Sequence, residues 1–302
     1  MKVAVGIDGG GTRATAVAVD ETGRELARSP GPAGIVETAR IDEVVSRLVI
    51  LVRAVLGQAG LTAPCDALVC ALAGAGREPQ RTQVELALTA AGTAGQVGIV
   101  TDAEAAFHDA FADDAGILLL AGTGSIAWGR GPGGERGRVG GWGGRIGDEG
   151  SAWAIGLAGL RAVARANDGR DPPTTLTDAL LLEPGIDDPS ALVRWAESAR
   201  KKDVAALGPI VLRMAGTDAA ARRIMEEAVA ELVLHVECLA KRLGPWPQGT
   251  AVALAGGLLE SGRPLRGPVC EAIADRLAGA RVLDRDIDGA RGAASLALAC
   301  IR

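Results

Sequence analysis

The 302-residue chain has only two histidines and few cysteines. His108 and His235 both lie in helical patterns, without a second His, Cys or Asp at metal-ligand spacing, so we expect neither to bind a metal. The five cysteines are scattered and odd in number, which argues against a zinc site, a redox pair or a disulfide framework. Any catalysis is therefore expected to rest on carboxylates.

The chain also lacks an excess of positive charge and any long hydrophobic run. Its formal net charge is −5 and its pI is about 5.3, which argues against a nucleic-acid partner. The opening residues 1–8 lack the cationic and then apolar signature of a secretory signal, and no apolar stretch reaches the roughly 18 residues of a membrane span. We expect a cytoplasmic protein without a membrane partner, in which any anionic ligand is held locally.

Glycine, in contrast, is abundant and gathers in three segments. Residues 140–153 contain six glycines, two carboxylates and two tryptophans directly before a helical pattern, which is typical of a loop built around a polar ligand. Two shorter turns, 9–12 and 122–125, each follow an apolar run that predicts a buried strand. Three such turns predict a nucleotide and a second substrate.

The hydrophobic periodicity predicts an α/β protein. The first part reads as strands 3–8, 14–20 and 24–28, helix 41–59, strand 66–72, helix 80–91, strand 97–100 and helix 103–111. Residues 116–129 repeat the strand, glycine turn and strand of residues 3–20, which indicates a structural duplication. The remainder predicts mainly helices, at 149–166, 176–182, 189–200, 204–215 and 219–243, and a last strand within 252–257.

The first short glycine turn joins two strands, so the P-loop and dinucleotide-binding patterns, which need a following helix, do not fit. Glycine lets the backbone approach a phosphate and direct its N–H groups at it. Asp8, just before the turn, could hold Mg²⁺ through water. The alternative is a tight hairpin beside an acidic residue, with an ordinary solvated arginine. The residues expected to bind phosphate are Gly10, Gly11, Thr12 and Arg13.

The second short turn has the same composition at the equivalent place of the second half, and two facing turns can clamp a polyphosphate such as ATP. Its expected phosphate-binding residues are Gly122, Thr123, Gly124 and Ser125. The strand that ends near residue 257 could place the backbone of Gly256 and Gly257 against an adenine or a ribose.

Three carboxylates are candidates for the chemistry. Asp102 lies where a predicted strand ends, and there it could accept the proton of a hydroxyl that attacks a γ-phosphate; the alternative is a helix N-cap. Asp148 and Glu149 could accept hydrogen bonds from sugar hydroxyls, with Trp142 or Trp153 offering an apolar face. Their alternative is an N-cap and first-turn partner of a helix that begins at Glu149.

These motifs resemble the BadF/BadG/BcrA/BcrD branch of the actin-like ATPase superfamily, and within it the N-acetylglucosamine kinases. The resemblance covers nearly the whole chain. It implies two ribonuclease-H-like domains with an interdomain cleft that closes on ATP, Mg²⁺ and an amino sugar, whose 6-hydroxyl is phosphorylated. The first domain would be 1–113, completed by the C-terminal helix 288–302, and the second 114–287 with helical insertions. A homodimer is the default expectation for such enzymes. The matching strings are Asp8-Gly-Gly-Gly-Thr12, Thr101-Asp102, Gly122-Thr-Gly-Ser125, Gly140-Gly-Trp-Gly143, Gly147-Asp-Glu-Gly-Ser151 and Ala255-Gly-Gly257.

The resemblance also implies a part for each matching residue. Asp102 would be the general base and Asp8 would assist Mg²⁺. Thr12 and Thr123 would touch phosphates, while Gly256 and Gly257 would approach the adenosine. The sugar contacts would come from Asp102, Gly141, Trp142, Gly143, Asp148 and Glu149.

The sequence departs from the family's pattern at one place that concerns the identity of the acceptor sugar. Kinases of this group usually carry a sugar-binding asparagine after the third strand, where this chain reads Ser29-Pro-Gly-Pro-Ala-Gly34. N-acetylglucosamine is the expected acceptor, and glucosamine, N-acetylmuramic acid or another hexose derivative stays open. A non-catalytic sugar or nucleotide sensor and a partner-coupled ATPase are the rival classes. The related activators of 2-hydroxyacyl-CoA dehydratases hold an iron–sulfur cluster through cysteines whose arrangement this sequence lacks.

Overall fold

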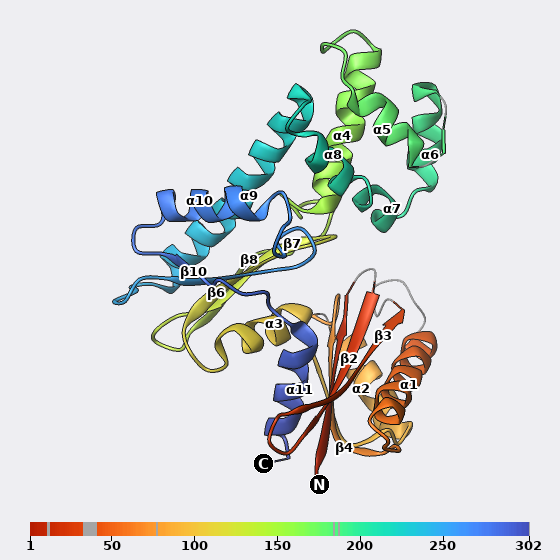
Figure 1. The fold of residues 1–302 in the computed structure, drawn as a ribbon, viewed down its shortest axis with the longest axis vertical. Coiled ribbons are helices and arrows are strands. Elements are labelled where there is room, and N and C mark those ends of the chain that lie inside the picture. Colours follow the sequence, from red (N-terminus) through yellow and green to blue (C-terminus); the bar gives the residue numbers. More distant parts are fainter. Residues whose placement is uncertain (11–12, 33–40, 77, 184, 187, 302) are drawn as a thin grey trace. The chain divides into compact units, whose positions relative to one another are not determined.

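The computed structural model describes residues 1–302 except 11–12, 33–40, 77, 184, 187 and 302. The chain forms two compact units (Figure 1). Unit 1 comprises Met1–Asp114 and Ile287–Arg302, and unit 2 comprises Ala115–Asp286. Each unit is built around its own five-stranded sheet.

The sheet of unit 1 has the strand order β3-β2-β1-β4-β5, in which β1 pairs antiparallel with β2 and parallel with β4. The predicted succession of strands and helices in this part of the chain is confirmed. Its elements are β1 (Val3–Gly9), β2 (Arg13–Asp20), β3 (Glu25–Pro32), α1 (Ile41–Gln58), β4 (Cys65–Leu72), α2 (Gln80–Ala90), β5 (Ala94–Val100), α3 (Asp102–Phe111) and α11 (Gly289–Ala299).

Both faces of this sheet are covered (Figure 1). Val5 and Ile7 of β1 point into a core shared with α1, whose apolar side chains recur at helical spacing. On the other face α11 lies directly over β1. The two backbones are so close at Gly6 that a Cβ there would lie only 2.0 Å from the backbone N of Ala294. The alanine-rich sequence of α11 therefore brings the start of this helix close to the end of β1.

Unit 2 repeats the same plan with the order β10-β9-β6-β7-β8: β6 pairs antiparallel with β7 and parallel with β9. The predicted duplication is confirmed by this shared topology. Its strands are β6 (Gly116–Ala121), β7 (Ser125–Arg130), β8 (Arg136–Gly140), β9 (Ala251–Ala255) and β10 (Arg281–Val282). Its helices are α4 (Ala152–Asn167), α5 (Leu176–Leu182), η1 (Pro189–Ala191), α6 (Leu192–Ser198), α7 (Lys201–Ala205), α8 (Gly208–Met214), α9 (Ala219–Leu243) and α10 (Arg266–Arg276).

The long helix α9 organises the core of unit 2, since its buried face packs on the sheet and on α4. Asp218 caps it: the carboxylate accepts hydrogen bonds from the N–H of Ala221 and from Thr174 and Thr175, at 2.8–2.9 Å. One aspartate thus ties the loop before α5 to the start of α9.

Several predicted boundaries in unit 2 were wrong. The helix expected from Glu149 begins at Ala152, because Ser151 is its N-cap and accepts the N–H of Ala154 at 3.3 Å. The helix expected over 189–200 is a short 3₁₀ turn followed by α6, and the one expected over 204–215 is α7 and α8. Strands β8 and β10 were not predicted.

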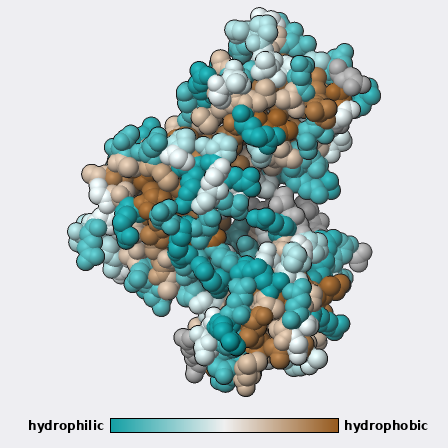
Figure 2. Space-filling view, viewed as in Figure 1, coloured by the Kyte–Doolittle hydropathy of each residue, from teal (hydrophilic) through white to brown (hydrophobic). Residues whose placement is uncertain are grey.

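Figure 2 shows that hydrophilic residues cover most of the face in view. Among the described residues no single helix is long and apolar enough to cross a membrane; one pair bent by 110°, Lys201–Met214 with Ala219–Leu243, passes by length and composition alone.

Candidate functional site

The carboxyl ends of three neighbouring strands place Asp8 and Asp102 at the same edge of the unit 1 sheet. Asp8 stands opposite Ala71 of β4, and Ala71 stands opposite Val100, the last residue of β5. Asp102 follows two residues later as the first residue of α3. The predicted placement of both carboxylates at strand ends is therefore correct, and this edge is where α/β sheets bind ligands.

The Asp8 carboxyl has a strongly perturbed acidity. Its pKa is raised from 3.8 to about 7, chiefly by burial and then by the negative charges of Asp102 and Asp288, while the charge of Arg13 lowers it. The start of α11 crowds the same group: a Cβ on Gly289 would lie 2.8 Å from Asp8 Oδ2. The charges of Asp102 and Asp288 thus act on the buried Asp8, and Arg13 offsets them only in part, an arrangement that favours a bound cation.

Asp102 is not the N-cap of its helix. Thr101 caps α3: its hydroxyl accepts the N–H of Glu104 at 3.1 Å, while the Glu104 carboxylate accepts the N–H of Thr101 at 2.8 Å. Asp102 Oδ1 accepts the adjacent N–H of Ala103 at 2.9 Å. The alternative that Asp102 serves as the cap was wrong.

Asp288 is a third carboxylate that the sequence analysis missed. It caps α11 by accepting the N–H of Arg291 at 3.1 Å and forms an ion pair with Arg28 at 2.7 Å. Asp109 of α3 in turn accepts the Asp288 N–H at 3.0 Å and pairs with Arg291 at 2.7 Å. The only signal in the sequence was an aspartate before a small-residue helix, which is an ordinary N-cap pattern.

Of the four residues predicted to bind phosphate in the first turn, the structure describes Gly10 and Arg13. Gly11 and Thr12 lie outside the described residues. Gly10 follows β1, and Arg13 begins β2 with an exposed side chain whose charge acts on Asp8.

In unit 2 the two predicted nucleotide turns lie side by side. Strands β6 and β9 are parallel neighbours with Leu120 opposite Ala255, so the turn 122–125 adjoins Gly256 and Gly257. The N–H of Leu258 donates to the carbonyl of Ala121 at 3.1 Å. Gly256 has φ +88°, and a Cβ there would lie 2.4 Å from the same carbonyl oxygen. Only glycine fits this close approach.

The turn 122–125 is also fixed to the start of α4. The carbonyl of Gly122 accepts the N–H of Ala152 at 2.9 Å, and the Ser125 hydroxyl donates to the carbonyl of Glu149 at 2.7 Å. The turn and the third glycine segment therefore form one connected structure.

Asp148 joins these two parts from inside the protein. Its backbone is left-handed, with φ +65°, and the residue is buried, at 3% exposure. Oδ1 lies 3.4 Å from the donating N–H nitrogen of Ser125, and a Cβ on Gly124 would lie 2.9 Å from the same oxygen. Oδ2 lies 2.6 Å from Lys201 Nζ. Because Ser151 caps α4, the N-cap alternative for Asp148 and Glu149 was wrong.

The glycine segment presents an aromatic surface to solvent. The Trp142 side chain is 60% exposed, and the guanidinium of Arg138 lies 5.0 Å from its ring centroid. The same guanidinium donates to the carbonyls of Gly140 and Gly141 at 3.1 and 3.3 Å. Arg138 was missed because it comes from the unpredicted strand β8. Trp153, in contrast, points its indole N–H at the carbonyl of Gly144, at 3.0 Å, and so supports the loop.

His235 of α9 is buried below the same segment. Its Nδ1 donates to the carbonyl of Glu231 at 2.6 Å, and its Nε2 lies 3.9 Å from Glu149 Oε2. A Cβ on Gly140 would lie 2.5 Å from its ring, so this histidine packs against the loop.

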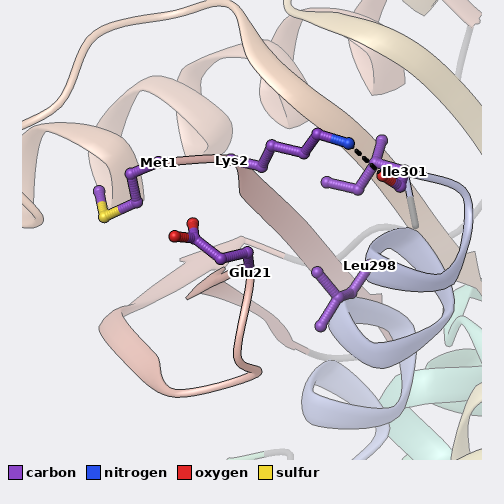
Figure 3. A pocket seen from close by; sticks show the side chains of 5 residues that line it. All are labelled: Met1, Lys2, Glu21, Leu298 and Ile301. Atoms are coloured by element: carbon purple, nitrogen blue, oxygen red, sulfur yellow. Dashed lines mark hydrogen bonds between the residues drawn. The ribbon is translucent and has the colours of Figure 1, made fainter.

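A shallow pocket of unit 1 lies away from these residues. It is formed at the opposite end of β1 from Asp8, where Lys2 donates to the carbonyl of Ile301 (Figure 3). The residues that line it are Met1, Lys2, Glu21, Leu298 and Ile301.

The duplicated sheets, each with a glycine turn after its first strand, define a protein of the actin-like ATPase fold class. A sequence profile of the BadF/BadG/BcrA/BcrD ATPase family matches residues 5–297, and the chain belongs to this family. The family and the fold class predicted from the motifs are both confirmed.

Three similar proteins carry sugar-kinase names. The chain is 30% identical to an N-acetylmuramic acid/N-acetylglucosamine kinase of Clostridium acetobutylicum over 267 residues, covering 86% of this chain and 87% of that one. It is 29% identical to an N-acetyl-D-glucosamine kinase of Dictyostelium discoideum, with 98% of each chain covered. The structure of a candidate N-acetylglucosamine kinase from Chromobacterium violaceum superimposes with a TM-score of 0.84 at 28% identity, covering 99% of both chains.

Proposed function

We propose that this protein is an ATP-dependent kinase that phosphorylates the 6-hydroxyl of an amino sugar, with N-acetylglucosamine as the first candidate. The observation that carries the proposal is the position of Asp102. It lies near Asp8 where the parallel strands of its sheet end, and Thr101, not Asp102, caps the helix α3. The sugar-kinase names of relatives that align over most of the chain support it.

In the proposed reaction Asp102 accepts the proton of the 6-hydroxyl. The hydroxyl oxygen forms a bond to the γ-phosphorus, the bond from that phosphorus to the β,γ-bridging oxygen breaks, and ADP leaves. The hydroxyl is a weak nucleophile until its proton moves, so we expect Asp102 to affect turnover more than nucleotide binding.

Backbone groups would hold the nucleotide. Glycine turns offer N–H donors to phosphate oxygens without a side chain that blocks their approach. We propose that the first turn, Gly10 to Arg13, and the second turn, Gly122 to Ser125, bind phosphates, and that Gly256 and Gly257 contact the adenosine.

Magnesium is the usual companion of ATP, and the residues of unit 1 fit it. Burial raises the pKa of Asp8 most, the negative charges of Asp102 and Asp288 raise it further, and a bound cation would offset both effects. Among the residues outside the masked positions, no three His, Cys, Asp or Glu side chains are grouped to hold a metal ion. We propose that Asp8 holds Mg²⁺ through water, and that the bound ion neutralises phosphate charge.

The exposed loop of unit 2 would bind the sugar. Trp142 offers an apolar ring face, Gly141 and Gly143 leave the backbone accessible, and the Glu149 carboxylate supplies an acceptor for hydroxyl groups. Asp148, predicted as a second acceptor, is buried and would support the sugar site from inside the loop. The predicted homodimer and cytoplasmic location stay predictions.

The test is ATP-dependent phosphorylation of a panel of hexoses with mass detection of the product: N-acetylglucosamine, glucosamine, N-acetylmannosamine, N-acetylmuramic acid and glucose. Asp102→Asn should lose turnover and keep ATP binding. The exposed Asp114→Asn of the same unit is the matched control and should behave as wild type. A sugar 6-phosphate made by the wild type supports the kinase and identifies its acceptor. No product from any sugar, with ATP still bound, would favour a sensor or a partner-coupled ATPase.

A further inference from the structure

The buried carboxylate of Asp148 is the starting point. Its side chain is 4% exposed, and Oδ2 accepts no hydrogen bond within the described part of the chain apart from its ion pair with Lys201. A buried charge needs a compensating partner, and the 3.4 Å contact of Oδ1 with the Ser125 N–H is long. The ammonium of Lys201 is thus the main group that stabilises this carboxylate.

Lys201 comes from outside the sheet. It is the first residue of α7, in the helical insertion between β8 and β9. Helices α7 and α8 pack at backbone distance on α4: a Cβ on Gly156 would lie 2.2 Å from the carbonyl of Val204, and one on Gly208 would lie 2.7 Å from the carbonyl of Ala152. This packing fixes the position of Lys201, at the start of α7, relative to the loop 141–149 that precedes α4.

We propose that Lys201 is a positioning residue for sugar binding: it holds Asp148 and, through it, the loop 141–149 against the glycine turn 122–125. The inference rests on the proposed function. Asp148 has one oxygen toward Ser125 of the turn and the other on Lys201, so loss of the ammonium leaves a buried charge without compensation and loosens both connections. The helical insertion thereby becomes part of the acceptor site.

The test compares Lys201→Met with Lys202→Met, because Lys202 is the next residue of α7 and its side chain is exposed. For Lys201→Met we expect at least a tenfold rise in the KM of the sugar. The KM of ATP should change less than twofold, because the turn 122–125 keeps its hydrogen bonds to Ala152 and Glu149. Lys201→Arg should recover most of the sugar affinity, since it restores the charge. Lys202→Met should match the wild type.

A double-variant cycle separates positioning from general damage. If Lys201 acts through Asp148, the double variant Asp148→Asn, Lys201→Met should have the same sugar KM as Asp148→Asn alone. If Lys201→Met unfolds at low temperature, the double variant takes its place as the folded protein for the comparison. It contains neither the carboxylate nor the ammonium, so no buried charge is left without a partner.

Two outcomes overturn the inference: a normal sugar KM in Lys201→Met, or effects of the two substitutions that multiply in the double variant. Failure of the proposed function looks different. In that case the wild type phosphorylates no sugar of the panel, whether or not its tryptophan fluorescence changes on titration with sugar alone.

Discussion

Replacing Asp8 with asparagine should stabilise unit 1 at neutral pH while it removes activity. The folded protein keeps this carboxyl protonated up to a pKa of about 7, against 3.8 for the unperturbed group, chiefly because of burial and then because of Asp102 and Asp288. At about 1.4 kcal/mol for each tenfold change in acidity, the difference corresponds to roughly 4 kcal/mol.

The sign follows from proton binding. Below about pH 4 Asp8 is protonated in both states, and its ionisation does not affect stability. Between about pH 4 and 7 the unfolded chain releases the proton and the folded chain keeps it, so the free energy of unfolding falls as the pH rises. Above pH 7 both forms are ionised and the loss is complete. Because asparagine does not ionise, Asp8→Asn should match the wild type near pH 4 and exceed it by about 2–4 kcal/mol at pH 8.

The assay must report on unit 1 alone. All five tryptophans lie in unit 2, at positions 128, 142, 153, 195 and 246. Hydrogen exchange of β1 and α11 peptides at pH 6, 7 and 8, corrected for the intrinsic exchange rate, would therefore measure unit 1, and tryptophan fluorescence in urea would measure unit 2 as an internal reference. Asp114→Asn is the control. A variant that is less stable than the wild type by the same amount at every pH would show that folded Asp8 is ionised, and would refute the reasoning.

Three further predictions concern stability and thiol reactivity. Gly256→Ala should destabilise unit 2 by about 1–3 kcal/mol and weaken binding of a fluorescent ATP analogue, because the new Cβ meets the carbonyl of Ala121 at a backbone with φ +88°; unchanged urea unfolding would contradict this. The pKa of Asp218 is lowered to about 2, since burial, which raises it, is outweighed by hydrogen bonds from a backbone N–H and two threonines. Its contribution is present above about pH 4 and lost as the pH falls toward 2, so Asp218→Ala should cost about 1–3 kcal/mol at pH 7 in fluorescence-monitored urea unfolding, with the difference shrinking toward pH 2. An aromatic disulfide reagent that releases a coloured thiolate should modify Cys238 and Cys300 in the native protein, and the three less exposed thiols only after denaturation. Equal reaction rates for all five thiols would contradict this prediction.

Much of the fold could be predicted because its strands carry continuous apolar runs and its helices a regular apolar face. Strand β8 could not, since its sequence Arg136-Gly-Arg-Val-Gly140 has charge and glycine where a strand usually has β-branched residues. Tertiary packing explains the composition: β8 is an edge strand, and Gly137 lets α9 approach, because a Cβ there would lie 3.1 Å from Leu239.

The candidate site divides in the same way. Asp8 and Asp102 could be predicted because each lies at or just after the end of an apolar strand run, where local sequence gives both the element and its end. Asp288 and Lys201 act on Asp8 and Asp148 from segments far away in the chain, and nothing local distinguishes them from a helix cap and a surface lysine. Their contribution depends on which elements pack together, as with α11 on β1.

The two units have the same topology but differ in how their buried carboxylates are compensated. This difference argues that the two units have different functions. In unit 1 burial, and then the charges of Asp102 and Asp288, raise the pKa of Asp8, and the charge of Arg13 offsets this only in part. In unit 2 the motif position that corresponds to Asp8 is the apolar Ala121, and the buried Asp148 is neutralised by Lys201. We therefore propose that a cation binds to unit 1, and that the turns of unit 2 bind the nucleotide through backbone N–H groups beside the charge-balanced Asp148. That is the division expected if unit 1 holds the metal and the base, and unit 2 binds nucleotide and sugar through backbone and neutral contacts.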